Sequence, residues 1–366
     1  MSYTLNKLHV STPGRICLFG EHQDYLNLPV IPCAISLRIS IEGVRREDSF
    51  VVIDLPDIKS KEQFRLEESK LYTQERDYYR SAINVLEGNG FRFSKGFDCV
   101  VRSAIPINAG TSSSSALMVT WINFLAQMSD QCRRLSPREI AFYAHVAEVI
   151  EFKEPGGMMD QYATAFGGVS VIDFFPKLRI HQVQADFKSF VLGNSGQRKD
   201  TRSVLSRVKN RVLDIVKVLS AKDKNFSLQD LSIDSIDGFK GQLNEEQQSL
   251  LVGTIRNRDI TSEAKKLLRQ TPLDHRRIGS LLTEHQNILR DVLKISTPKI
   301  DRMIDAALDA GACGAKINGS GGGGCMFAYV PEHSTRVAAA IEKAGGTAYI
   351  VHVDEGTRNE HSEMLK

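Results

Sequence analysis

The pattern of apolar and polar residues predicts mainly strands at the start of the chain. Within residues 30–44, apolar residues at 35, 37, 39 and 41 alternate strictly with polar residues at 36, 38, 40 and 42, which is typical of a strand with one buried face. Apolar runs predict three further strands, at residues 8–19 (bent at Pro13-Gly14), 49–55 and 97–102. Residues 75–86 have helical spacing and are followed by the turn G-N-G, which ends a helix. We therefore expect the first part of the chain to combine strands with helices.

Helical spacing dominates the second half of the chain. Beyond about Ile180 the sequence changes to basic helical stretches and a polar segment at residues 222–242. Helices are predicted within residues 245–283, 297–310 and 334–344, and a strand at residues 347–353. This pattern predicts helices packed on one sheet. We place a domain boundary near residue 180, which gives domains of residues 1–180 and 181–366.

A glycine-rich segment interrupts the second half. It runs from Gly314 to Val330 as G-A-K-I-N-G-S-G-G-G-G-C-M-F-A-Y-V. Four consecutive glycines are costly to order, because each glycine loses more backbone freedom on folding than any other residue. A run of this kind therefore indicates main chain that packs closely against another glycine-rich or anionic element.

A second segment of this kind precedes a predicted helix in the first half. Gly110-Thr111 and the serines 112–115 lead into residues 116–128, which are apolar nearly all round and predict a buried helix. The unpaired N–H groups and the dipole at a helix N-terminus favour an anion. The serine hydroxyls could cap this helix or bind phosphate and magnesium. One cap requires one serine, so four exceed that need.

Polar residues gather in the turn G-E-H-Q-D-Y, directly after the first predicted strand. The turn places Glu21, His22 and Asp24 within four residues. Polar side chains at a strand end are well placed for a small ligand, although a solvated hairpin loop would show the same composition.

Acidic residues follow on the next predicted helix. Ser136-Pro137-Arg138-Glu139 forms a capping box with proline in the first turn. Glu148 and Glu151 are three residues apart, so we expect them to share one side of this helix. They predict either a solvated acidic face or a carboxylate that binds a metal.

Asp160 lies in the segment P-G-G-M-M-D-Q-Y, among methionine and aromatic residues. An unpaired carboxylate is costly to bury. We therefore expect a nearby cation as its partner.

Composition narrows the class of protein. The chain has 366 residues, which favours two domains, and its formal net charge is only +3. No block of like charge predicts binding to nucleic acid or a membrane, and the basic cluster at residues 198–211 is typical of a solvated helix face. No apolar run reaches membrane-spanning length and the start of the chain lacks an apolar signal core, so a cytoplasmic location is expected. The six cysteines form no C-x-x-C pair and are expected to be buried, reduced thiols.

Three segments, taken in order, resemble the superfamily of galactokinase, homoserine kinase, mevalonate kinase and phosphomevalonate kinase. They are P-G-R-I-C-L-F-G-E-H-Q-D-Y, P-I-N-A-G-T-S-S-S-S-A and G-A-K-I-N-G-S-G-G-G-G-C. The resemblance covers most of the chain. It implies an ATP-dependent small-molecule kinase of the α+β class. Its first domain would contain a left-handed βαβ crossover, and its second domain would be ferredoxin-like.

The resemblance also implies roles for individual residues. Asp160 would be the catalytic base, with Arg15 as the cation beside it. The sugar would be bound by Glu21, His22, Asp24 and Gly157. ATP would contact Gly110, Thr111, Ser112, Ser113, Ser114, Ser115, Gly321, Gly322 and Gly323. Mg²⁺ would be held by Ser114 and Glu148, with Glu151 as the alternative carboxylate.

The motifs differ in the substrate that they favour. The turn G-E-H-Q-D-Y and the G-x-M-D-Q around Asp160 resemble galactokinase, whereas the glycine segment and S-T-P-K-I-D resemble mevalonate kinase. The loop F-V-L-G-N-S-G-Q-R-K-D-T matches neither closely. We expect phosphorylation of a monosaccharide, such as galactose or a heptose, at its anomeric hydroxyl.

Two alternatives stay open beside this expectation. One is a mevalonate kinase that acts on a branched hydroxy acid, and the other is a sensor that binds sugar and ATP without catalysis. A dinucleotide-binding oxidoreductase is excluded by the lack of a G-x-G-x-x-G motif in the required context. The expected partners are a sugar and ATP, with no nucleic acid or membrane, for a monomer or homodimer.

Overall fold

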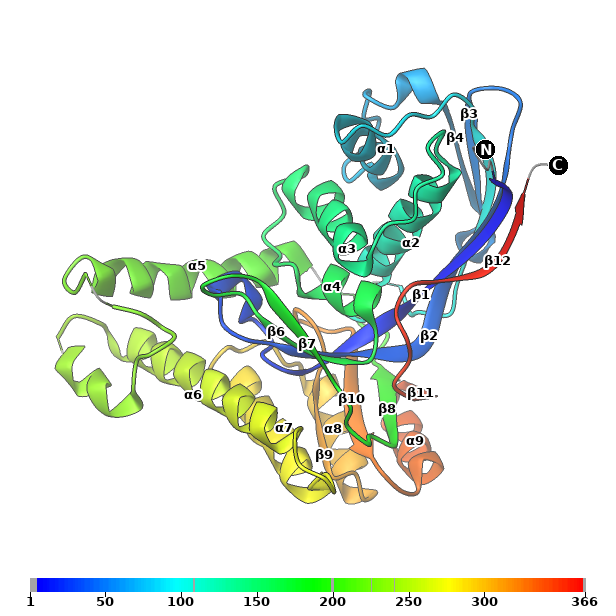
Figure 1. Ribbon diagram of the computed structural model, residues 1–366. Coiled ribbons are helices and arrows are strands. Elements are labelled where there is room, and N and C mark those ends of the chain that lie inside the picture. The colour runs from blue at the N-terminus through cyan, green and yellow to red at the C-terminus, as the bar shows by residue number, and fades with distance from the viewer. Residues whose placement is uncertain (1–4, 108, 199–200, 225, 240, 365–366) are drawn as a thin grey trace.

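The computed structural model describes residues 5–107, 109–198, 201–224, 226–239 and 241–364. Asn108, within the expected phosphate loop, and Lys199-Asp200, within the basic cluster, lie outside the described residues. Two sheets form the framework. The long strands β1 and β2 run side by side through the molecule, from the part that carries α1, α2 and α3 toward the part that carries α7, α8 and α9 (Figure 1).

The larger sheet is built on two 15-residue antiparallel strands, β1 (Leu5–Phe19) and β2 (Ile31–Arg45). It continues through β5 (Phe97–Ser103), β3 (Phe50–Leu55) and β4 (Ser60–Arg65). Two more strands, β6 (Val169–Asp173) and β7 (Arg179–Val183), join at β2. The register between β1 and β2 shifts at Pro13/Gly14, so the predicted bend is confirmed. β3 and β5 are parallel, and the chain crosses between them through β4 and α1.

Four helices pack with this sheet, namely α1 (Tyr78–Gly88), α2 (Ser113–Met128), α3 (Pro137–His145) and α4 (Met159–Phe166). α2 is the central one, because it contacts β1 and β2 as well as the other three helices. Its nearly uniform apolar sequence predicted this burial. The predicted capping box at the start of α3 is confirmed, because the Ser136 hydroxyl accepts a hydrogen bond from the Glu139 N–H at 3.3 Å.

The end of α3 departs from the predicted pattern. The Glu151 N–H donates to the Val146 carbonyl at 3.0 Å, which is the i→i+5 bond of a π-helical turn over Val146–Ile150. The wider turn separates two residues that were expected to share a side. Glu148 is buried, whereas Glu151 is exposed and accepts a hydrogen bond from the Tyr72 hydroxyl. The prediction that they share a side is therefore wrong.

The smaller sheet is antiparallel, in the order β11-β8-β10-β9. Its strands are β8 (Ser189–Asn194), β9 (Gly314–Ile317), β10 (Cys325–Val330) and β11 (Thr347–Val351). Helices α5 (Thr201–Ser220), α6 (Glu245–Leu267), α7 (His275–Asp291) and α8 (Pro298–Asp309) lie between β8 and β9 in the chain, and α9 (Ser334–Lys343) lies between β10 and β11. This strand order, 4-1-3-2 in chain order, is the expected ferredoxin-like arrangement.

The last strand returns to the larger sheet. β12 (Arg358–Met364) pairs antiparallel with β1, although the sequence assigned residues 181–366 to the second domain. The connection is fixed by an ion pair between Arg38 and Asp354 at 2.8 Å and by a hydrogen bond from Thr12 to Thr357 at 2.9 Å. The chain first passes from the larger sheet to the smaller one between β7 and β8. β7 ends at Val183, close to the boundary expected near residue 180.

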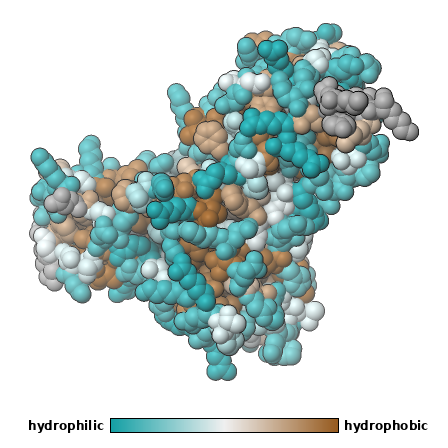
Figure 2. All heavy atoms as spheres, viewed as in Figure 1, coloured by the Kyte–Doolittle hydropathy of each residue, from teal (hydrophilic) through white to brown (hydrophobic). Residues whose placement is uncertain are grey.

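Two apolar cores hold the molecule together, one in each part. β1 contributes to both, since Leu18 packs in one core and Leu8 in the other. The six cysteines are free thiols, four of them buried. Hydrophilic residues cover most of the face in Figure 2, and the apolar residues that show lie mainly near its centre. No helix among the described residues is both long and apolar enough to cross a membrane.

Candidate active site

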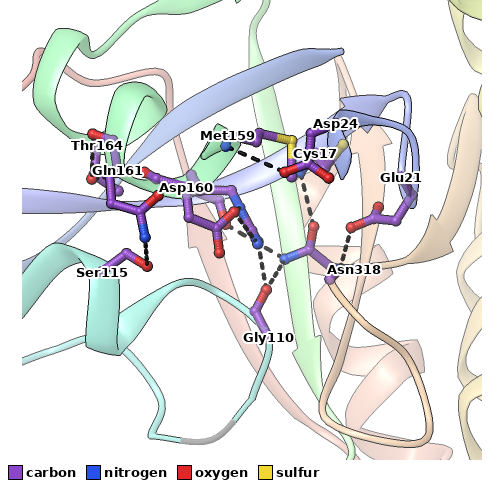
Figure 3. Close-up of polar contacts among 12 residues, drawn as sticks. Cys17, Glu21, Asp24, Gly110, Ser115, Met159, Asp160, Gln161, Thr164 and Asn318 are labelled. Carbon is purple, nitrogen blue, oxygen red and sulfur yellow. Dashed lines mark hydrogen bonds and ion pairs between the residues drawn. The ribbon is translucent and has the colours of Figure 1, made fainter. Parts of the chain in front are cut away.

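A cavity of about 280 Å³ brings together residues from both halves of the chain. Its walls come from the G-E-H-Q-D-Y turn, the serine segment, the π-helical turn, the start of α4 and the start of the glycine-rich segment. These segments are distant in sequence and meet because β1 ends at the turn while α2 and α4 begin at the same place (Figure 3). The site residues expected in the first domain therefore lie together.

Asp160 has the cationic partner that its sequence context predicted. It lies in the first turn of α4, where the helix dipole favours a carboxylate, and its Oδ1 accepts hydrogen bonds from Arg15 Nε at 2.9 Å and Nη2 at 2.7 Å. Arg15 is 3% exposed, whereas the Asp160 side chain is 30% exposed and lines the cavity. Both hydrogen bonds end on Oδ1, so Oδ2 is the oxygen that can receive a proton from a bound hydroxyl.

Arg15 also fixes the loop before α2. Its Nη1 donates to the Gly110 carbonyl at 2.6 Å, and the Asn318 side-chain amide donates to the same carbonyl at 2.8 Å (Figure 3). Asn318 in turn accepts a hydrogen bond from the Cys17 backbone N–H at 2.9 Å. One network therefore connects the Asp160 carboxylate, β1, the serine segment and the second domain.

The start of α2 has the properties of an anion site. Ser112 precedes the helix in a left-handed conformation (φ 61°) and makes no capping hydrogen bond. Its hydroxyl is buried and has no hydrogen-bond partner among the described residues. Ser112 and the three serines after it line the cavity, so the N–H groups at the start of the helix and the Ser112 hydroxyl are placed to bind a phosphate. The capping alternative for Ser112 is thus contradicted.

Glu148 supplies a carboxylate beside these serines. Burial raises the pKa of Glu148, whereas hydrogen bonds from Ser114, Gln161 and Ser115 act in the opposite direction. The Gln161 amide nitrogen donates to Glu148 Oε2 at 2.6 Å, which leaves Gln161 Oε1 buried without a hydrogen-bond partner in the described part of the chain. A carboxylate, a hydroxyl and an amide oxygen are hard ligands that fit Mg²⁺. Among the residues that the structure describes, no three histidine, cysteine, aspartate or glutamate residues form a group that could hold a metal ion.

Glu21 and His22 contact the second domain. Glu21 Oε2 pairs with Lys316 Nζ, and Oε1 accepts the Gly319 N–H at 2.5 Å. His22 Nε2 lies 3.0 Å from the Ser320 carbonyl. Both residues line the cavity, but these bonds hold the turn against the glycine-rich segment.

Asp24 presents a second carboxylate to the cavity. Its oxygens accept hydrogen bonds from the backbone N–H groups of Tyr25 at 2.9 Å and Met159 at 3.3 Å. Burial and the nearby Asp160 charge raise the pKa of Asp24 to about 6. Gly157 lies against it, because a Cβ at Gly157 would be 2.0 Å from Asp24 Oδ2. Asp24 and Gly157 therefore form one surface.

The glycine-rich segment packs under the serine segment, and the sequence pattern indicated this contact. A Cβ on Gly319 (φ 78°) would lie 2.7 Å from the Gly110 carbonyl oxygen. By contrast, the three glycines expected to contact ATP are not among the cavity-lining residues in the described part of the chain. Instead, Gly321 packs against Ile295, Gly322 against Val204 and Gly323 against Gln197.

A second cavity, of about 310 Å³, adjoins the first and is mostly apolar. Its walls include Leu55, Tyr79, Val101, Ile107 and Leu117. Four residues line both cavities, namely Arg76, Tyr78, Ser113 and Ser114. The two cavities therefore meet at the start of α2.

Sequence reasoning missed several residues of this site. Lys316 stands alone in an apolar strand, and a buried lysine requires an acidic partner, so its position was a usable signal. Asn318 belongs to the quoted glycine motif, but only the tertiary structure places it on Gly110. Arg76 and Glu154 line the first cavity as an ion pair, and no local pattern marks either of them.

Comparison with known proteins agrees with this geometry. The model of the GHMP kinases N terminal domain matches residues 77–168, and that of the GHMP kinases C terminal matches residues 264–347. The galactokinase galactose-binding signature matches residues 3–43. These regions contain the turn, the serine segment, Asp160 and the glycine-rich segment.

Mevalonate kinases and galactokinases both match this sequence over nearly the whole chain. Mevalonate kinase of Thermococcus sibiricus is 29% identical, over 96% of this chain and 97% of its own. Galactokinase of Homo sapiens is also 29% identical, over 96% of this chain and 92% of its own.

The fold is that of a solved galactokinase. The structure of Lactococcus lactis galactokinase complexed with galactose superimposes with a TM-score of 0.86, at 22% identity, over 96% of this chain and 95% of that one. The matched domains, their order and the fold lead to one conclusion: the chain belongs to the GHMP kinases, a family of ATP-dependent kinases.

Proposed function

We propose that this kinase transfers the γ-phosphoryl group of ATP to the anomeric hydroxyl of a neutral monosaccharide. The observation that carries the proposal is the pair of carboxylates, Asp24 and Asp160, in one cavity. Hydroxyl groups of a sugar can donate hydrogen bonds to both. The carboxylate of a hydroxy acid such as mevalonate would be repelled there, and Arg15 is already bound to Asp160.

Asp160 is suited to accept the proton of the attacking hydroxyl. Arg15 holds Oδ1 with two hydrogen bonds, and Oδ2 of this cavity-lining residue has no hydrogen-bond partner among the described residues. The guanidinium balances the charge of the Asp160 carboxylate and stabilises negative charge near the transferring group. The anomeric hydroxyl is the most acidic hydroxyl of a sugar, so a carboxylate base matches it.

Nucleotide binding is divided between the two cavities. The apolar cavity provides a site for the adenine base, and the free hydroxyl of Ser112 with the N–H groups at the start of α2 provides a site for the phosphates. Phosphoryl transfer depends mainly on positioning and charge stabilisation, and this loop is well fixed by Arg15 and Asn318.

The oxygen ligands beside the π-helical turn fit Mg²⁺. Glu148, Ser114 and Gln161 Oε1 would hold it, and when bound it would neutralise charge on the β- and γ-phosphates. Glu151 is the less suitable carboxylate, because it is exposed and bonded by Tyr72.

A mevalonate kinase activity is the second candidate, since a relative of that name is as similar to this chain as a galactokinase is. An assay of ADP release over galactose, other neutral monosaccharides and mevalonate separates the two. We expect turnover with a neutral sugar, and a loss of about 100-fold or more in kcat for Asp160→Asn with ATP binding retained. Turnover with mevalonate alone would refute the proposal.

A further inference from the structure

An ion pair lies where the two cavities meet. Arg76 Nε donates to Glu154 Oε1 at 2.8 Å, and Arg76 Nη2 donates to Oε2 at 2.9 Å. Arg76 lines both cavities, whereas Glu154 lines only the first. A nucleotide with its base in the apolar cavity and its terminal phosphates at Ser112 would therefore run close to Arg76.

Arg76 has donors left for such a ligand. Two of the five guanidinium N–H groups bind Glu154. The others have no acceptor in the part of the chain that the structure describes. Glu154 holds the guanidinium by two parallel hydrogen bonds, so the direction of the remaining donors is fixed.

Arg76 also differs from the other cation in the cavity lining. Among the described residues, Arg15 and Arg76 are the lysine or arginine residues that line the first cavity. Arg15 is 3% exposed and is committed to Asp160 and Gly110. The Arg76 side chain is 38% exposed and the Glu154 side chain is 11% exposed. Arg76 is therefore the cation that a nucleotide phosphate can reach.

We propose that Arg76 binds the α-phosphate of the nucleotide, and that Glu154 is a positioning residue that orients Arg76. The inference rests on the proposed function, because it assumes that the base occupies the apolar cavity. Guanidinium donors match phosphate oxygens better than they match the uncharged ribose. Arg76 has a left-handed backbone conformation (φ 59°) two residues before the start of α1, which fixes the position from which its side chain extends.

Calorimetric titration with ADP, AMP and adenosine tests this assignment. We expect Arg76→Met to weaken ADP and AMP binding about tenfold or more and to leave adenosine binding unchanged. Arg76→Lys should recover part of the loss, because it retains the charge. Arg133→Met is the matched control, since Arg133 also forms an ion pair with a glutamate but lines neither cavity.

The positioning role of Glu154 has its own readout. Glu154→Gln should weaken ADP binding about threefold in the wild-type background and have no effect in the Arg76→Met background. A merely structural role would give the same loss in both backgrounds, and would overturn this part of the inference. Thermal melting should show that each variant is folded.

The outcomes distinguish this inference from the proposed function. If Arg76→Met binds ADP as tightly as the wild type, the inference alone fails. If Arg76→Met loses as much affinity for adenosine as for ADP, Arg76 contacts the nucleoside and not the α-phosphate. If it loses affinity for ADP but not for AMP, Arg76 contacts the β-phosphate instead. Each result overturns the assignment. A wild-type protein that binds none of the three ligands would overturn the proposed function too.

Discussion

Lys316, in a strand of the second domain, binds Glu21 at the end of β1, and the two side chains are 0% and 2% exposed. Lys316 Nζ also donates to the carbonyls of Cys17 and Ile317, both at 2.9 Å. Glu21 accepts the Gly319 N–H with its other oxygen. The pair therefore ties the turn that carries Asp24 to the glycine-rich segment beneath the serines.

Removing one member of the Lys316–Glu21 pair should lower the stability of the fold strongly. Lys316→Met leaves the Glu21 carboxylate buried without its counter-charge, and we expect a loss of about 3–5 kcal/mol in the free energy of unfolding. The double variant Lys316→Met/Glu21→Gln should recover part of it, because no unpaired charge stays buried. Lys265→Met, which breaks a more exposed pair with Asp173, is the control and should cost about 1 kcal/mol or less. Denaturant titration measures all three. Equal losses for the two lysine variants would contradict the buried-pair account.

Gly157 should be required for acceptor binding through its contact with Asp24. A Cβ at Gly157 would overlap the Asp24 carboxylate, so Gly157→Ala should displace it and lower kcat/KM for the sugar about tenfold or more. Gly156→Ala is a matched control, because a Cβ there would meet no atom within 4 Å. Steady-state kinetics and ADP titration check both. A loss confined to ADP affinity would show that Gly157 contacts the nucleotide instead.

The raised pKa of Asp24 predicts opposite effects on stability and activity. The pKa of Asp24 is about 6 in the folded protein and close to 4 in an unfolded chain, so this carboxyl destabilises the fold increasingly as pH rises from about 4 to 6. Asp24→Asn should therefore raise the melting temperature at pH 8 more than at pH 5. In the wild type, kcat/KM for the sugar should rise with pH up to about 6 and then level off. The variant should lose both this inflection and most sugar binding. A variant no more stabilised at pH 8 than at pH 5 would contradict the assignment.

Glu148, in the π-helical turn, and Glu151, directly after it, should differ in their effect on magnesium. Glu148→Gln should raise the Mg²⁺ concentration needed for half-maximal activity about tenfold, because it removes a buried carboxylate beside Ser114. Glu151→Gln should leave it unchanged, since Glu151 is exposed and bound by Tyr72. A magnesium titration of turnover compares them. An effect of Glu151→Gln equal to that of Glu148→Gln would refute the choice between the two.

Local sequence was sufficient for some of the site and insufficient for the rest. Asp160 could be singled out because a carboxylate among apolar residues requires a partner, and Arg15 provides it. The choice between Glu148 and Glu151 could not be made, because the α-helical spacing does not apply in a π-helical turn. Arg76 gives no local signal, since its role depends on the meeting of two cavities.

The same distinction holds for the fold. Alternation of apolar residues predicted β2, and the capping box predicted the start of α3, because both patterns are local. The return of Arg358–Met364 to the first sheet is a long-range pairing with β1 that its largely polar and exposed residues do not indicate.

The position of the transferred phosphate shows which hydroxyl group of the sugar attacks ATP. The product formed from ATP and the best neutral sugar in the acceptor assay is analysed by correlated phosphorus and proton NMR. We expect the new phosphorus signal to couple to the anomeric proton of the sugar, and we expect Asp160→Asn to yield no such signal over the same time. A phosphate on another hydroxyl, or a product formed from mevalonate and from no sugar, would contradict this expectation.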